Sequence, residues 1–125
     1  MTTRRPLPLA AALLLALAAA ALPAQDAAKV SPKTVHVKLD NDRVRVLEAM
    51  SEPGEREGMH SHPASIVYVV EGATLRISTP DGKSTVVTFK TGDTIWREPV
   101  THAAENVGKT RFHAIIVEMK EPGTR

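Results

Sequence analysis

The stretch HSHPASIVYVVEG, residues 60–72, decides how the rest of this 125-residue sequence is interpreted. It opens with His60-Ser61-His62 and runs into an unbroken series of β-forming residues, 66–70. Side chains two apart in an extended strand point to the same face, so the His-x-His pair directs two imidazoles into one volume. A third imidazole, His102, lies forty residues further on. Three imidazoles make a metal site only if the fold brings them together.

Short β-type segments surround these histidines. In 34–39, for example, apolar and polar residues alternate, as in a half-buried strand. Residues 51–59 contain Pro53 and Gly54 and are expected to form a loop leading into His60. The run 66–70 is apolar on both faces, which predicts a central strand covered by a second sheet. The expected strands are 34–39, 43–50, 66–70, 74–79, 84–90, 94–98, 102–106 and 111–120. Eight short strands without a convincing amphipathic helix predict an all-β sandwich or barrel.

The first 24 residues have the pattern of a secretory signal peptide. Arg4 and Arg5 precede the apolar run 7–22, and Ala24 offers a small residue for cleavage. The run is short for a membrane span, which needs about 20 residues. We therefore expect a periplasmic or secreted protein with no membrane association after cleavage. The two arginines also partly resemble a twin-arginine signal, so export in a folded state is an alternative route.

The rest of the chain is expected to be one domain with short extensions. Residues 25–33 should be a flexible N-terminal arm, 34–120 the β-domain and 121–125 a tail. The sequence has no cysteine, so no disulfide stabilises the fold, and a homodimer would help to bury apolar surface. Without the leader, 14 basic residues face 14 acidic ones, and this balance predicts no nucleic-acid partner.

Two motifs resemble those of the cupin superfamily. The first comprises Gly54, five further residues, His60-Ser61-His62 and the segment 68–72; the second comprises Gly92-Asp93, Pro99, His102 and Asn106. The resemblance covers about half of the chain and implies a jelly-roll β-barrel. It also implies that the three histidines bind a divalent metal, for which Zn, Fe, Ni, Cu and Mn are all candidates.

The family's usual glutamate ligand is absent, and counting back from Gly72 puts Ser65 in its place. Ser65 is at best a hydrogen bonder to a bound water. Glu98, which shares strand parity with Trp96, is the preferred replacement carboxylate. Glu55 and Glu57 are further candidates, although solvated loop charges are the commoner outcome.

Several other side chains have two interpretations. Tyr68 and Trp96 could line the pocket or pack in the core. Arg97 and Arg76 could select an anionic substrate or be ordinary exposed strand arginines. Among the remaining candidates, His36 is expected to face solvent, His113 to be a hydrogen-bonded wall residue, and Asn106 to be structural.

Three functions are compatible with this sequence. The first is a metal-dependent enzyme, such as a dioxygenase, isomerase or lyase, acting on a small metabolite. Some cupin dioxygenases use three histidines, so the missing glutamate does not exclude catalysis. The second is a non-catalytic module that binds a small ligand or a metal. The third is a metal-free structural cupin in which the three histidines are hydrogen-bonded polar residues.

Overall fold

The computed structural model describes residues 25–122, which form nine strands and one short helix. These elements are α1 (Ala27–Val30), β1 (Val35–Asp40), β2 (Val44–Ser51), β3 (Arg56–His62), β4 (Ser65–Glu71), β5 (Thr74–Ser78), β6 (Ser84–Thr88), β7 (Thr94–Arg97), β8 (Val100–Asn106) and β9 (Phe112–Met119). Within this range, no helix is long and apolar enough to cross a membrane. The predicted leader, 1–24, lies outside the described residues.

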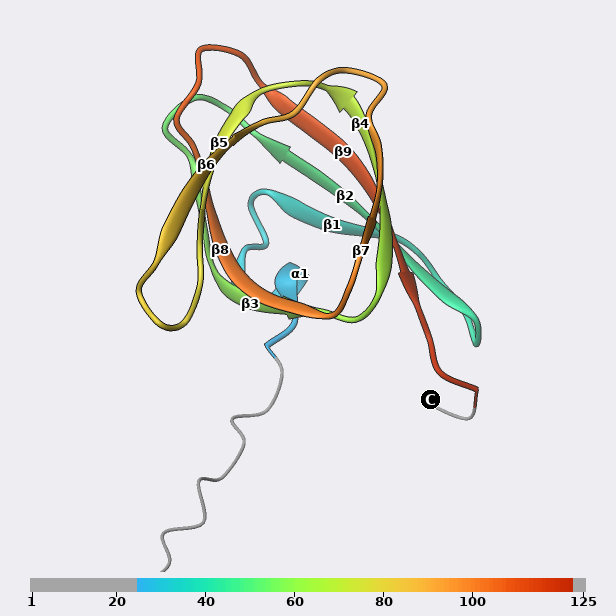
Figure 1. The fold of residues 1–125 in the computed structure, drawn as a ribbon. Coiled ribbons are helices and arrows are strands. Elements are labelled where there is room, and N and C mark those ends of the chain that lie inside the picture. The colour runs from blue at the N-terminus through green and yellow to red at the C-terminus, as the bar shows by residue number, and fades with distance from the viewer. Residues whose placement is uncertain (1–24, 123–125) are drawn as a thin grey trace, which may run out of the picture.

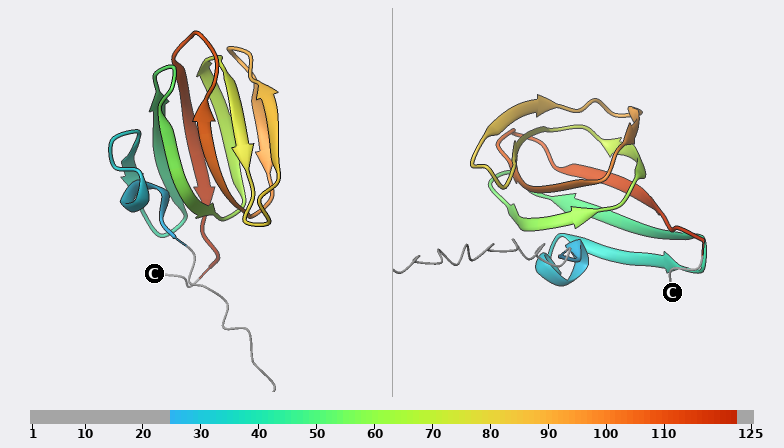
Figure 2. Two further views of the ribbon diagram at one scale, coloured as in Figure 1. Left: turned by 90° about the vertical axis from the view of Figure 1, so that its left-hand side faces the viewer. Right: turned by 60° about the horizontal axis from the view of Figure 1, so that its bottom comes forward.

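The strands form two antiparallel sheets that lie face to face (Figure 1). One sheet has the order β1-β2-β9-β4-β7, and the other has the order β3-β8-β5-β6. Two views from other directions show the same pair of sheets (Figure 2). The predicted all-β jelly roll is confirmed. Hydrogen bonding leaves two separate sheets, however, and does not close them into a continuous barrel.

Alternating side chains build the core between the sheets. On β9, for example, Phe112, Ala114 and Ile116 are buried, whereas the residues between them are partly exposed. Leu47 of β2 and Val69 of β4 are fully buried against the same core. Burying such side chains supplies the main free energy of folding in a chain without disulfides.

The segment 66–70 differs from its prediction on one face. Val67 and Val69 point into the core, but Ile66 and Tyr68 are 37% and 48% exposed on the outer face of the five-stranded sheet. The second sheet therefore covers one face of β4 and not both. An apolar run cannot distinguish these cases, because its composition is the same on the buried and the open face.

The region 51–59 also differs, because its second half is a strand. Residues from Arg56 onward belong to β3 and pair with β8. A β-bulge interrupts this pairing: Glu57 lies opposite Ala104, but His60 lies opposite His102. Three steps along β3 thus match two steps along β8. The extra residue reverses the usual alternation and lets Glu57 and His60 face the same side.

The N-terminal segment 25–33 is attached to the fold, so the expectation of a loose arm is wrong. Ala27 is 2% exposed, and α1 packs against β3 and β1. The Ser61 N–H donates to the carbonyl of Gln25 at 2.8 Å, and Asp26 forms an isolated parallel bridge with Ser61. The segment therefore lies along the strand that carries His60 and His62.

Candidate metal centre

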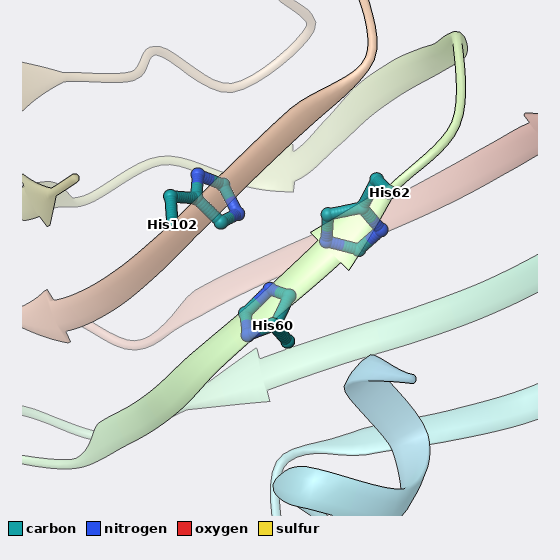
Figure 3. A group of neighbouring side chains, drawn as sticks. All are labelled: His60, His62 and His102. Atoms are coloured by element: carbon teal, nitrogen blue, oxygen red, sulfur yellow. The ribbon is translucent and has the colours of Figure 1, made fainter. Parts of the chain in front are cut away.

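Three imidazoles meet on the inner face of the four-stranded sheet (Figure 3). His60 and His62 lie two apart on β3, and His102 on β8 is paired directly with His60. The three side chains are buried, with residue exposures of 1%, 4% and 6%. Their ring centroids are 4.7, 4.8 and 5.4 Å apart, and one nitrogen of each lies within 4.8 Å of the other two. The strand pairing therefore brings together histidines that are forty residues apart in sequence.

Hydrogen bonds behind two of the rings fix their orientation. The Nδ1–H of His60 donates to the Gly58 carbonyl at 2.7 Å, and the Nδ1–H of His62 donates to Glu118 Oε2 at 2.7 Å. An imidazole that donates through Nδ1 keeps a lone pair on Nε2 when it is neutral. The Nε2 of His60 is buried and has no hydrogen-bond partner among residues 25–122. The lone pair of this nitrogen is thus free to bind a metal ion in the cluster.

The surroundings keep the rings of His60 and His102 neutral. Burial lowers the pKa of His60, and burial together with the positive charge of Arg97 lowers the pKa of His102 to about 3. Protonated rings would leave no lone pair for a metal ion. Near neutral pH, His60 and His102 are therefore already in the form that binds a cation.

Comparison with solved structures identifies the family. A crystal structure of a cupin domain from Bordetella pertussis Tohama I is 31% identical to this chain with a TM-score of 0.64, and the match covers 70% of this chain and 92% of that domain. The chain belongs to the cupin superfamily. An uncharacterised protein with a double-stranded β-helix domain from Klebsiella pneumoniae is 25% identical, with a TM-score of 0.55 and 70% coverage of both chains. An RmlC-like cupin family protein from Methanocaldococcus jannaschii matches the fold with a TM-score of 0.56 at 12% identity, covering 70% of this chain and 80% of that chain. No family model and no curated protein matches the sequence.

Ser65 stands at the position that the motif resemblance gives to a glutamate ligand. It is fully buried, and its Oγ has no hydrogen-bond partner within the described part of the chain. On one side its strand pairs it with Glu118 of β9, and on the other with Arg97 of β7. A carboxylate, that of Glu118, therefore lies on the strand next to Ser65.

That carboxylate, Glu118, was not among the candidates chosen from the sequence. Its side chain is 5% exposed, holds His62 from behind and lies 3.8 Å from Arg45 Nη1. A signal was present in the sequence, because Glu118 shares strand parity with three buried residues, Phe112, Ala114 and Ile116. A single acidic residue on an apolar strand face indicates a specific partner.

Glu57 is a second carboxylate beside the cluster. Its Oε2 lies 3.9 Å from His60 Nε2, and its side chain is 12% exposed. Burial raises the pKa of Glu57 to about 6. The loop expected over 51–59 predicts a solvated carboxylate at this position, whereas the bulge in β3 turns it inward. Glu55, the other candidate carboxylate of this region, forms a salt bridge with Lys33 at 2.8 Å.

Three residues predicted for the site lie elsewhere. Glu98 is exposed and accepts a hydrogen bond from Trp96 Nε1 at 2.8 Å, so it is not a replacement ligand. Trp96 and Tyr68 are 56% and 48% exposed and do not line the cavity. The shared parity of Trp96 and Glu98 was correct, but both face outward because Ile95 and Arg97 occupy the inner face of β7.

The remaining predictions concern His36, His113 and Asn106, none of which belongs to the histidine cluster. His36 is exposed, and His113 makes a 3.0 Å contact with Glu48 on the outer side of the sheet. Asn106 is 1% exposed and donates to the carbonyls of Ser51 and Thr110. These contacts fit the structural roles expected for His113 and Asn106.

A cavity of about 300 Å³ adjoins the histidines. His62 and His102 form part of its wall, together with Glu57 and Arg97. Most other wall residues are apolar, including Val67, Leu75 and Phe89. A small molecule in this space would therefore lie beside the cluster and contact few polar groups.

Proposed function

We propose that this cupin binds a divalent transition metal through His60, His62 and His102, and that the bound metal acts on a small molecule in the adjacent cavity. The observation that supports the proposal best is the buried Nε2 of His60, which no protein group satisfies among the described residues. A buried polar atom without a partner costs roughly 1–3 kcal/mol. A metal ion bound there would remove this cost, whereas a metal-free structural role would not.

The donor set fits a borderline divalent cation. Three imidazoles suit Zn, Fe(II), Ni, Cu or Mn, and the absence of a glutamate ligand leaves the charge of the ion less compensated. When bound, such an ion would supply Lewis acidity and open coordination positions. The protein would contribute imidazoles, two of which are held from behind by Gly58 and Glu118.

Glu57 favours an enzyme over a passive metal-binding module. Its carboxylate lies on the cavity wall and close to His60 without a lysine or arginine salt bridge in the region 25–122. A carboxylate placed between a metal site and a substrate pocket can accept or return a proton. This position supports a reaction with a proton-transfer step, as in isomerases, lyases and many dioxygenases.

The metal site is tested by elemental analysis of protein purified without an affinity tag. We expect about one equivalent of a transition metal, and a loss of at least about tenfold in bound metal for His62→Ala and for His102→Ala, because each change leaves an incomplete donor set. His36→Ala is the matched control, since His36 is exposed on β1 and should leave the metal content unchanged. Unchanged metal content in both site variants would refute the site.

Catalysis is tested separately. We expect turnover of an O2-consuming or carbonyl substrate that a chelator abolishes and a single metal restores. Glu57→Gln should keep the metal content and lose most of the turnover. A metal-loaded protein that binds candidate substrates and converts none of them would leave the binding module as the better interpretation.

A further inference from the structure

Arg97 is an inward-facing arginine in a mainly apolar cavity. It ends β7, where Ile95 and Arg97 line the cavity while Trp96 between them is exposed. The neighbouring strand β4 places Ser65 directly beside it. Ser65 is fully buried, and its Oγ has no hydrogen-bond partner among residues 25–122.

This guanidinium has no bonded counter-ion. Its Nε is buried and without a hydrogen-bond partner, and Arg97 forms no salt bridge with any residue in 25–122. Glu57 and Glu118 are near enough for their charges to act on it, but neither carboxylate bonds to it. Burial lowers the pKa of Arg97, which reflects the lost hydration of its charge. A buried arginine of this kind is stabilised when an anion supplies the missing hydrogen bonds.

The rest of the cavity defines what kind of anion fits. Its volume is about 300 Å³, and much of its wall is aliphatic or aromatic; representative wall residues are Leu75, Ile77, Phe89, Ile95, Val100 and Phe112. An apolar body therefore gains from burial against these side chains. The two nearby carboxylates disfavour a second negative charge, so a monoanion fits better than a phosphate dianion.

We propose that the cavity binds a small organic acid, with its carboxylate on Arg97 and its apolar body against the aliphatic and aromatic side chains of the wall. The planar guanidinium matches a carboxylate in a bidentate arrangement, which a lysine cannot reproduce. The proposal rests on the proposed function, since it names the substrate class of the cavity that His62 and His102 border. It assigns Arg97 the role of a specificity-determining residue.

Calorimetric titration with benzoate and with its neutral isostere benzamide tests this assignment. Measurements on metal-loaded and on chelator-treated protein separate binding to Arg97 from binding to a metal ion. We expect wild-type protein in both states to prefer benzoate over benzamide by at least about tenfold. R97Q should lose this preference while keeping its metal content. R76Q is the matched control, because Arg76 is a strand arginine that pairs with Glu105 on the outside, and it should bind like the wild type.

Two results would overturn the proposal: wild-type protein that binds both probes equally, or R97Q that retains the preference for benzoate. R97K provides a second check that does not depend on the folding of R97Q, since it keeps the positive charge and loses the bidentate fork. Its benzoate affinity should fall several-fold, and an affinity equal to that of the wild type would contradict the bidentate contact. A wild-type protein that contains no metal but still prefers benzoate would refute the metal site alone.

Discussion

At the residue scale, two of the three imidazoles owe their orientation to the groups behind them. His60 is anchored by a backbone carbonyl and His62 by the buried carboxylate of Glu118. A carboxylate behind a metal-binding imidazole fixes the tautomer and raises the basicity of the opposite nitrogen. In this cupin, Glu118 of the five-stranded sheet supports His62 of the four-stranded sheet. The carboxylate therefore comes from a distant part of the chain and does not directly follow the His-x-His motif.

This arrangement predicts the effect of Glu118→Gln. The amide can still accept a hydrogen bond from His62 Nδ1, but it carries no charge, so metal affinity should fall about tenfold. Glu48→Gln is the matched control, because Glu48 contacts His113 Nε2 at 3.0 Å on the outer side of the same sheet. Competition with a chromophoric chelator measures both variants. Equal affinities for Glu118→Gln and the control would show that Glu118 does not tune the site.

At the element scale, the N-terminal segment supports the strand that carries two of the histidines. Asp26 caps α1 by accepting a hydrogen bond from the Ala28 N–H at 2.9 Å. It also binds Arg45 of β2 through both carboxylate oxygens, each at 2.8 Å. Arg45 in turn lies 3.8 Å from Glu118. A chain of charged groups therefore connects α1 to the residue that orients His62.

Asp26→Ala should accordingly lower the free energy of unfolding by about 1–3 kcal/mol, because it removes a helix cap and a charge-assisted hydrogen bond to a partly buried arginine. Urea denaturation measures this change. Asp42→Ala, in the exposed turn between β1 and β2, is the control and should change stability by less than about 0.5 kcal/mol. If the two substitutions had the same effect, the N-terminal segment would not stabilise the fold.

At the scale of the whole molecule, the five-stranded sheet exposes apolar side chains on its outer face. Ile66 and Trp96 are cross-strand partners there, and Tyr68 follows on β4. Their exposures of 37%, 56% and 48% are high for large apolar or aromatic residues that are neighbours. A contiguous exposed apolar patch of this kind favours self-association.

We therefore expect a homodimer that buries this face. The double substitution Tyr68→Lys and Trp96→Lys should shift the protein to monomer, because it places charges in the apolar contact. Light scattering coupled to size-exclusion chromatography reports the mass. Val86→Lys is the control, since Val86 is 57% exposed on β6 of the other sheet and should leave the dimer intact. A monomeric wild type would contradict the expectation.

The sequence predicted the positions of the strands better than it predicted which of their side chains are buried. Alternation and turn residues located eight of the nine strands in 25–122, because these signals are local. The ninth strand, β3, was only partly recognised, since Pro53, Gly54 and Gly58 indicated a loop and a β-bulge follows Glu57. The loop expected over 51–59 makes Glu57 a solvated charge, whereas the bulge in β3 brings it to the same face as His60.

By itself, the sequence predicted an all-β protein, because alternation and turn residues act over a few neighbouring residues. The resemblance of two motifs to those of the cupin superfamily added the fold and three candidate metal-binding histidines. Only the tertiary structure decided which charged groups accompany them: Glu118 holds His62 from behind and Arg97 lines the cavity, while Glu98 and Trp96 face outward. The reason is physical. The direction of a strand face depends on which sheet covers it, and that pairing joins residues far apart in the chain.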